Sequence, residues 1–238
     1  MEGDVPYRML AFDHDETLAV DGTVHPSAAA ALAAARDAGW LLALVTGRTH
    51  ARILEICPCV DVFDLVVDEN GAVLYFPATG VVENLAHGPD VRLREELRRR
   101  GVPFTPGRIV TITKRMHEEH VRDIIDACGL ALDCYCNRPA VMIVPRGTSK
   151  ETGLRTGLKR VGVVPEDVIA VGDDENDFAL FEVAGLCVAV GNAIDAVKCA
   201  ADVVLDRPNG EGVAAFIRER ILGSPELLPP PRDPPLVF

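Results

Sequence analysis

Apolar residues in this chain form short uninterrupted runs, and polar residues gather where those runs end. Such runs, bounded by turn-forming residues, are typical of buried strands, and the alanine-rich or amphipathic segments between them indicate helices. Over the first part of the chain this predicts strands and helices in alternation, the order of a parallel α/β sheet. The predicted strands cover 7–12, 41–45, 65–67 and 72–76, and the predicted helices cover 26–38 and 50–56.

The pattern changes between residues 81 and 145, where charged helical segments and strands occur without the earlier rhythm. This predicts a smaller α+β insert that acts as a cap. Its predicted helices cover 91–100 and 118–128, and its strands cover 109–113, 130–135 and 141–144. The alternation of strands and helices then resumes. Helices are predicted at 149–161, in a segment that ends at 181, in a segment that begins at 193, and at 212–221. Strands are predicted at 168–171, 186–190 and 203–204.

These patterns divide the chain into a discontinuous core over 1–80 and 146–223, a cap over 81–145 and a tail over 224–238. The tail is rich in proline, which cannot continue a helix. We therefore expect the tail to be a loose, extended terminus.

Two carboxylates, Asp13 and Asp15, directly follow the first predicted strand. At the carboxyl end of a parallel strand, both would face the crevice where open α/β sheets bind their ligands. Carboxylates held this close repel each other unless they share a cation or a proton. The spacing therefore predicts a divalent metal site or an acid with a perturbed pKa.

Three further polar clusters follow predicted strands or begin predicted helices, at 46–48, 147–150 and 172–177. Each alone has an ordinary structural interpretation: a lysine that begins a helix is usually solvated, an acidic run can cap a helix, and a short polar run can be a turn. In an open parallel sheet, however, all of them converge on the same crevice as Asp13 and Asp15. Their joint placement favours a functional site.

The four clusters read D-x-D-x-T at 13–17, T-G-R at 46–48, a lysine at 150 and G-D-x-x-N-D at 172–177. In these ordered motifs the chain resembles the haloacid dehalogenase superfamily of phosphatases. The insert and the turn at 69–72 resemble its Cof-like, sucrose-phosphate phosphatase and phosphoglycolate phosphatase branch. The resemblance runs from Tyr7 to about Ile221. It implies an α/β fold with a Rossmann-like, doubly wound, mostly parallel core sheet and an inserted α+β cap.

The resemblance also implies a mechanism. Asp13 would be the nucleophile and form an aspartyl phosphate, which divides a difficult displacement into two easier ones. Asp15 would protonate the leaving alkoxide and later deprotonate the hydrolytic water.

The remaining motif residues would hold a metal ion and the phosphate. The implied cofactor is Mg²⁺, held by Asp13, the main-chain carbonyl of Asp15, and Asp173, with Asp177 nearby. Thr46, the Gly47 amide and Lys150 would contact phosphate oxygens. The supporting residues are Thr17, Arg48 and Asn176, where Asn176 would orient Asp177 or Lys150 and the Thr17 hydroxyl could instead bond only to the local backbone.

The amino-acid composition narrows the range of expected binding partners. A net charge of −12 argues against a sequence-independent grip on nucleic acid or on an anionic membrane. The N-terminal residues show no basic-then-apolar signal, and the seven cysteines are typical of reduced thiols, so we expect a cytoplasmic protein. The expected partner is a small phosphorylated metabolite. The sequence leaves the oligomeric state open.

Two other functions remain open at this stage. A phosphomutase could use the same scaffold, and a receiver-like phosphate-sensing module also places Asp, Thr and Lys around a metal. A receiver-like function would not explain why Asp15 and the long insert are present. Within the first motif, Glu16 replaces the glycine common in this branch and has no evident role, and His14 could contact the substrate or cap or could simply be packed.

Overall fold

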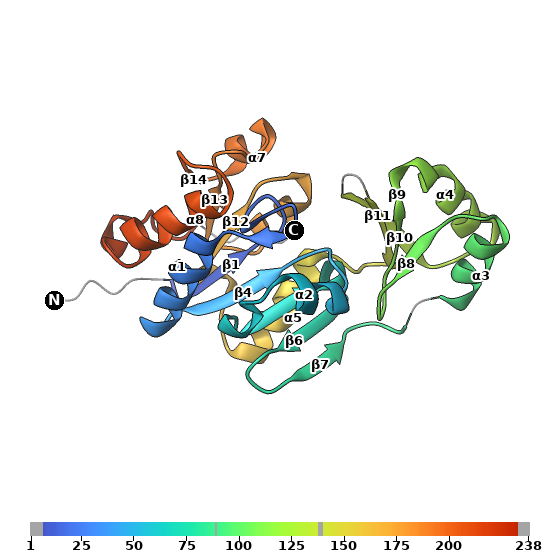
Figure 1. Ribbon diagram of the computed structural model, residues 1–238, viewed down its shortest axis with the longest axis horizontal. Helices are drawn as coiled ribbons and strands as arrows, with labels where there is room; N and C mark the ends of the chain where they lie inside the picture. The colour runs from blue at the N-terminus through green and yellow to red at the C-terminus, as the bar shows by residue number, and fades with distance from the viewer. Residues whose placement is uncertain (1–6, 89, 138–139, 233–238) are drawn as a thin grey trace.

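The computed structural model describes residues 7–88, 90–137 and 140–232. Its larger part is built on an eight-stranded sheet in the order β14-β13-β12-β1-β4-β5-β6-β7 (Figure 1). The pairs from β14 to β5 are parallel, and β6 and β7 join antiparallel, so the predicted α/β class with a mostly parallel sheet is confirmed. The strands are β1 Met9–Phe12, β4 Leu41–Val45, β5 Leu65–Asp68, β6 Val73–Phe76, β7 Val81–Asn84, β12 Val168–Gly172, β13 Leu186–Ala189 and β14 Val203–Val204.

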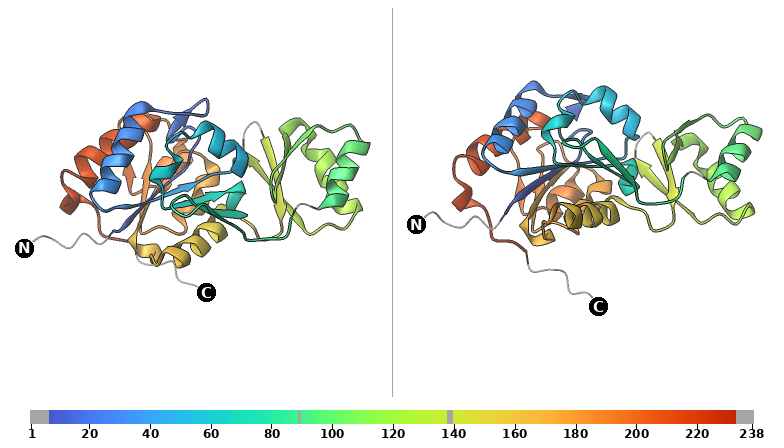
Figure 2. Two further views of the ribbon diagram at one scale, coloured as in Figure 1. Left: turned by 60° about the horizontal axis from the view of Figure 1, so that its bottom comes forward. Right: turned by 90° about the horizontal axis from the view of Figure 1, so that it is seen from below.

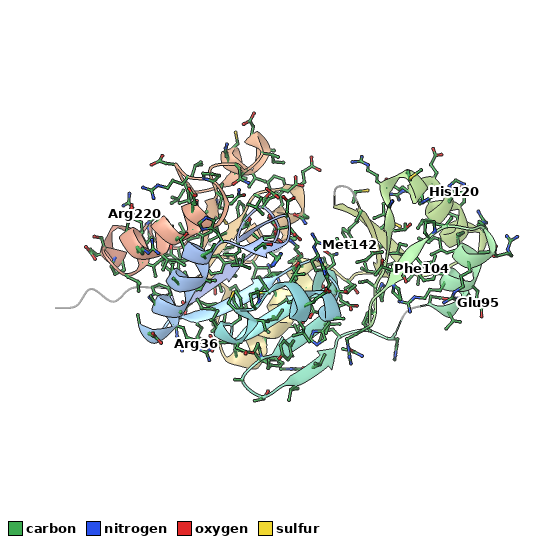
Figure 3. All side chains as sticks on the ribbon, viewed as in Figure 1. Arg36, Glu95, Phe104, His120, Met142 and Arg220 are labelled. Carbon is green, nitrogen blue, oxygen red and sulfur yellow. The ribbon has the colours of Figure 1, made fainter. Side chains whose placement is uncertain are left out.

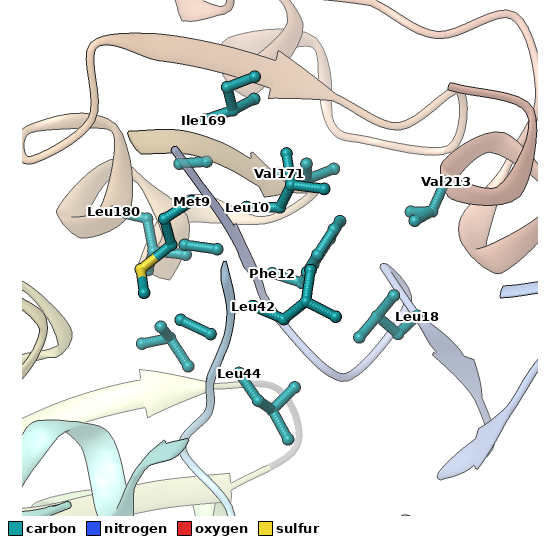
Figure 4. Close-up of a cluster of buried hydrophobic side chains, with 14 of the residues drawn as sticks. Met9, Leu10, Phe12, Leu18, Leu42, Leu44, Ile169, Val171, Leu180 and Val213 are labelled. Atoms are coloured by element: carbon teal, nitrogen blue, oxygen red, sulfur yellow. The ribbon is translucent and has the colours of Figure 1, made fainter. Parts of the chain in front are cut away.

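Strand β1 lies in the middle of this sheet, between β12 and β4. All four of its residues are fully buried, because both of its faces are covered by apolar side chains from neighbouring elements. Figure 4 shows Phe12 among Leu42, Leu18 and Val171 in this cluster. A rigid, buried strand therefore carries the chain directly into Asp13.

Helices cover both faces of the large sheet. Helix α1 (Pro26–Asp37) packs against α8 (Asn209–Phe216), and α5 (Lys150–Val161) packs on β5 and β6 at the opposite face (Figure 2). Helix α5 begins with a reciprocal capping box between Ser149 and Thr152, which fixes the position of its first residue, Lys150. The other helices of this part are α2 (His50–Ile56), α6 (Phe178–Phe181) and α7 (Asp195–Ala200).

The insert forms a second, antiparallel sheet in the order β10-β11-β9-β8, with its own apolar cluster against two helices. This is the predicted α+β cap. Figure 3 shows Met142 of β11 on the side nearer the large sheet, whereas His120 and Glu95 of the helices lie on the far side. The elements are α3 Val91–Arg99, β8 Phe104–Pro106, β9 Thr111–Lys114, α4 Glu118–Ala127, β10 Leu132–Asn137 and β11 Ala140–Pro145.

Several short elements differ from the predicted ones. Strands β2 (Ala19–Val20) and β3 (Thr23–Val24) form an antiparallel hairpin around Asp21 and Gly22. Strand β7 pairs with β6 in the large sheet, although the predicted insert starts at residue 81. The predicted last helix is divided into α8 and a π-helical turn at Ile217–Ile221. The exact domain limits stay a prediction, and residues 1–6, 89, 138–139 and 233–238 of the predicted domains lie outside the described part.

The prediction of a loose tail is wrong for residues 224–232. The Tyr7 hydroxyl donates to the Pro229 carbonyl at 2.6 Å, and Leu228 packs against the main apolar cluster. Arg232 donates to Asp202 and to the Ala200 carbonyl, at 2.7 and 2.6 Å. Side-chain donors of Tyr7 and Arg232 therefore hold this proline-rich segment against the core. Over the described residues, no helix is long and apolar enough to cross a membrane.

Candidate active site

Asp13 and Lys150 meet at the carboxyl end of β1. The Asp13 amide donates to the Val171 carbonyl at 3.0 Å, which continues the strand pairing by one residue. The Lys150 ammonium donates to Asp13 Oδ1 at 2.6 Å and to Asp177 Oδ1 at 2.9 Å. Lys150 is only 1% exposed and Asp13 only 5%, so the ion pairs are buried. Residues separated by 137 positions in sequence are thus brought into direct contact.

Asp177 and Asp173 come from the turn after β12. The Asp177 Oδ2 atom accepts from the amides of Asp173 and Asp174, at 2.9 and 3.2 Å. A Cβ added at Gly172 would lie 2.6 Å from the Asp177 side chain, so the glycine allows this close return of the chain. The Thr17 hydroxyl donates to Asp173 Oδ1 at 2.7 Å. Thr17 therefore bonds to a distant carboxylate and not to its local backbone.

Asp13, Asp173 and Asp177 each present a carboxylate oxygen within 4.8 Å of the others. All three residues are buried. Hard cations such as Mg²⁺ prefer oxygen ligands and carboxylates above all. The donor set therefore fits the predicted Mg²⁺, and the Asp15 side chain is outside the cluster, as a main-chain ligand would be.

The electrostatics of the cluster also favour a cation. Burial and the neighbouring Asp177 raise the pKa of Asp13, and burial and Asp13 raise the pKa of Asp173 to about 8. Burial alone would lower the pKa of Lys150, but Asp13 and Asp177 outweigh it and raise that pKa. One ammonium is available to three carboxylates, so ionisation of all three would leave surplus negative charge that a divalent cation would balance.

Asp15 lies beside this cluster and is held by Arg48. The guanidinium donates two parallel hydrogen bonds to the Asp15 carboxylate, both at 2.8 Å. Burial would raise the pKa of Asp15, but the His14 ring at 3.4 Å and Arg48 outweigh it and hold that pKa well below its usual range. His14 is fully buried, and neither ring nitrogen makes a hydrogen bond with the described residues. His14 is therefore buried beside Asp15, where its ring acts on the charge of that carboxylate.

Glu16 has an exposed side chain and a backbone φ of 58°. This left-handed conformation is easy for glycine and strained for other residues. It gives a physical reason why glycine is common there in the branch that the sequence resembles. The Glu16 carbonyl accepts from Asn192 at 2.9 Å, which helps to hold the strained turn.

Thr46, Gly47 and Arg48 follow β4 as a tight turn. The Thr46 hydroxyl accepts from the Arg48 amide at 3.1 Å, and Thr46 is fully buried. Among the described residues, the Asn176 side chain makes no hydrogen bond to Asp177 or Lys150, so no contact supports its predicted orienting role.

Sequence reasoning marked the turn at 69–72 but missed Asp68, the last residue of β5, and His50 in α2. The His50 Nδ1 atom lies 2.7 Å from Asp68 Oδ2, and Tyr75 packs edge-on against the His50 ring. Burial raises the pKa of Asp68 to about 6. Glu69, next in the chain, is also fully buried. Two adjacent carboxylates at the end of an apolar strand repeat the signal at Asp13 and could have revealed this pair.

Comparison with known proteins agrees with this geometry. The chain matches the haloacid dehalogenase-like hydrolase family over residues 10–86 and 108–217, which includes all four motifs. The chain belongs to the haloacid dehalogenase-like hydrolases. The predicted resemblance is therefore confirmed.

This haloacid dehalogenase-like hydrolase is similar in sequence to several proteins named phosphoglycolate phosphatase. The phosphoglycolate phosphatase of Methanopyrus kandleri is 37% identical over 132 residues, which cover 55% of this chain and 57% of that protein. That match spans little more than half of the relative's length. The phosphoglycolate phosphatase of Methanothermobacter thermautotrophicus is 29% identical over 216 residues, covering 86% of this chain and 96% of that protein.

Solved structures support the same fold for this haloacid dehalogenase-like hydrolase. A haloacid dehalogenase-like hydrolase from Bacteroides thetaiotaomicron superposes with a TM-score of 0.79 at 21% identity, covering 90% of this chain and 99% of that one. The family makes this chain a haloacid dehalogenase-like hydrolase, and the sequence relatives described above are named phosphatases.

Proposed function

We propose that this chain is a Mg²⁺-dependent phosphatase that hydrolyses a small phosphorylated metabolite through an aspartyl phosphate. The observation that carries the proposal is the buried Lys150 ammonium, bonded to Asp13 and Asp177 at the end of the central strand. A phosphoryl group beside Asp13 would have a nucleophile, a fixed positive charge and a cation site around it.

The reaction would proceed in two displacements. Asp13 attacks phosphorus, the P–O bond to the leaving group breaks, and Asp15 gives its proton to the departing oxygen. Asp15 then accepts a proton from the water that attacks the aspartyl phosphate, which releases phosphate and restores Asp13. Lys150, the Thr46 hydroxyl and the Gly47 amide would balance the charge on the phosphoryl oxygens.

Arg48 affects the proton transfer from Asp15 in the first of these two displacements. While Arg48 is bonded to Asp15, that carboxylate is poorly suited to carry a proton. We expect a bound phosphate ester to compete for the guanidinium and so release Asp15 to act as an acid.

The proposed Mg²⁺ would be held by Asp13, Asp173 and the Asp15 carbonyl, with Asp177 nearby. When bound, it would neutralise the crowded carboxylates and the phosphate.

The proposed substrate class is phosphoglycolate or a small sugar phosphate. The names of the sequence relatives support phosphoglycolate. The cap over the site would exclude water and contact the leaving group.

The decisive experiment measures phosphate release with Mg²⁺ from a panel of phosphorylated metabolites. We expect Asp13→Asn to lower turnover by about 10³-fold or more, because the nucleophile is lost. The matched control is Asp37→Asn, an exposed aspartate at the end of α1, which should keep full activity. Normal turnover by Asp13→Asn would exclude this mechanism, and conversion of a sugar phosphate without phosphate release would indicate a phosphomutase.

A further inference from the structure

The segment 107–110, which leads into β9 of the cap, is held by a carboxylate from the core. Glu69 Oε1 accepts from the Arg108 amide at 2.8 Å. Glu69 Oε2 accepts from the amides of Ile109 and Val110, at 2.8 and 3.0 Å. Glu69 is fully buried. Three successive backbone N–H groups of the cap thus converge on a single side chain of the core.

The cap holds the same segment from its other side. Arg94 of α3 donates from Nη2 to the carbonyls of Gly107 and Val110, at 3.1 and 2.9 Å, and from Nε to the Thr111 hydroxyl at 3.0 Å. A Cβ added at Gly107 would lie 2.6 Å from both carboxylate oxygens of Glu69. The carboxylate therefore occupies the space of a side chain at residue 107, and the contact requires glycine.

The backbone of Glu69 reaches in the opposite direction, toward the Thr46–Arg48 turn. The Glu69 amide donates to the Arg48 carbonyl at 2.9 Å, and the Asn70 amide donates to the Thr46 carbonyl at 3.1 Å. Glu69 and Asn70 have φ values of 52° and 59°, a conformation that residues other than glycine rarely adopt. The turn persists in it because its amides and the Glu69 side chain are bonded on both sides.

A continuous set of contacts therefore joins the cap to the acid/base residue. The amides of 108–110 bind the Glu69 carboxylate, the Glu69 amide binds Arg48, and the Arg48 guanidinium binds Asp15. Nothing in this set requires the metal or a substrate. An apolar contact of β6 with cap residues, which includes Val73 and Val144, lies beside it and would keep the two parts together without Glu69.

We propose that Glu69 is a positioning residue. It couples the position of the cap to the position of the Thr46–Arg48 turn and, through Arg48, to that of the Asp15 carboxylate. When the cap moves relative to the core at residues 107–110, Glu69 moves the Arg48 backbone with it. This changes how the Arg48 guanidinium holds Asp15. The proposal rests on the proposed phosphatase function, because it assigns Glu69 a role in the proton transfer of that reaction.

The test uses Glu69→Gln, which keeps the size of the side chain and replaces one acceptor oxygen by a donor. The matched control is Glu83→Gln on β7, whose carboxylate pairs with Arg160 at 2.7 Å and contacts no cap amide in the described structure. Hydrogen exchange at the amides of 108–110 measures whether they remain bonded to residue 69, and it does not depend on turnover. We expect exchange there to be at least about tenfold faster in Glu69→Gln and unchanged in Glu83→Gln.

The second readout is the dependence of kcat on the leaving group. p-Nitrophenyl phosphate releases a phenolate that needs little help from an acid, whereas an alkyl phosphate needs the proton of Asp15. We expect Glu69→Gln to lower kcat about tenfold more for the alkyl phosphate than for the aryl phosphate. A role in cap attachment alone would lower both rates by the same factor.

The outcomes separate the two proposals. If wild type hydrolyses both substrates and Glu69→Gln lowers both equally, or leaves amide exchange at 108–110 unchanged, the positioning role is overturned and the phosphatase assignment stands. If wild type hydrolyses neither substrate, the phosphatase assignment fails and the positioning role fails with it. Should Glu69→Gln not fold, Gly107→Ala displaces the same carboxylate without removing it and must give the same leaving-group dependence.

Discussion

Replacing Lys150 by methionine removes the single ammonium bonded to two buried carboxylates while keeping most of the side-chain volume. Removal of one partner from a buried charge pair costs about 3–5 kcal/mol, because the remaining charge has no compensation. For a chain of this size each kcal/mol lowers Tm by about 2–4 °C, so we expect a fall of about 6–20 °C in the metal-free protein.

The loss of stability should depend on pH in a defined direction. The pKa of Asp13 is already raised in the folded protein, and the Lys150 ammonium acts to lower it. Without Lys150 that pKa rises further, so the folded state binds a proton more tightly than the unfolded state does. Stability then falls as pH rises through the raised pKa. The penalty in Lys150→Met should be smallest near about pH 5.5 and largest at about pH 8.

Thermal unfolding in EDTA and in saturating Mg²⁺ measures this effect, with phosphate release as the second readout. Mg²⁺ should restore part of the lost Tm, and turnover should fall by about 10²–10³-fold. Lys159→Met, an exposed lysine on the same helix, should change neither quantity. A Tm of Lys150→Met within about 1 °C of wild type in EDTA at high pH would refute the buried charge network.

Two further predictions concern the metal and the tail. Because Mg²⁺ must displace protons from Asp13 and Asp173, whose pKa values are raised, the gain in Tm from Mg²⁺ should be larger at about pH 8.5 than at about pH 6, and calorimetry should detect proton release on binding. An equal gain at both pH values would place the metal elsewhere. Arg232→Ala should lower the free energy of unfolding by about 1 kcal/mol, since its ion pair with Asp202 is partly exposed. Denaturant titration checks this against Arg220→Ala, an exposed arginine on the π-helical turn, and equal stability of the two variants would show that the Arg232 contacts contribute nothing.

The central strand and its two aspartates could be predicted because their signal is local. Met9–Phe12 is continuously apolar, and Asp13 and Asp15 follow it at once. The same holds for Thr46 and Asp173, each placed directly after an apolar strand. The four motifs then meet because parallel strands end at a common edge.

Contacts made between distant segments could not be predicted in this way. The bond from Thr17 to Asp173 spans 156 positions, and nothing near Thr17 marks its partner. Strand β7 contains Glu83 and Asn84, so only its pairing with β6 makes it a strand. The tail looked unpacked because proline cannot donate, whereas its anchors are the side chains of Tyr7 and Arg232.

The central position of β1 also has a consequence for biosynthesis. The β4 partner of Met9–Phe12 is made early in synthesis, but its other neighbour, Val168–Gly172, is made much later, after the whole cap. Until then β1 presents an unpaired, entirely apolar edge, which is a site for non-native pairing. A nascent chain released before Asp177 would contain the nucleophile and a finished cap but no complete reaction centre. Catalytic competence is therefore acquired only after Asp177 has been made, when the second half of the core closes on the first.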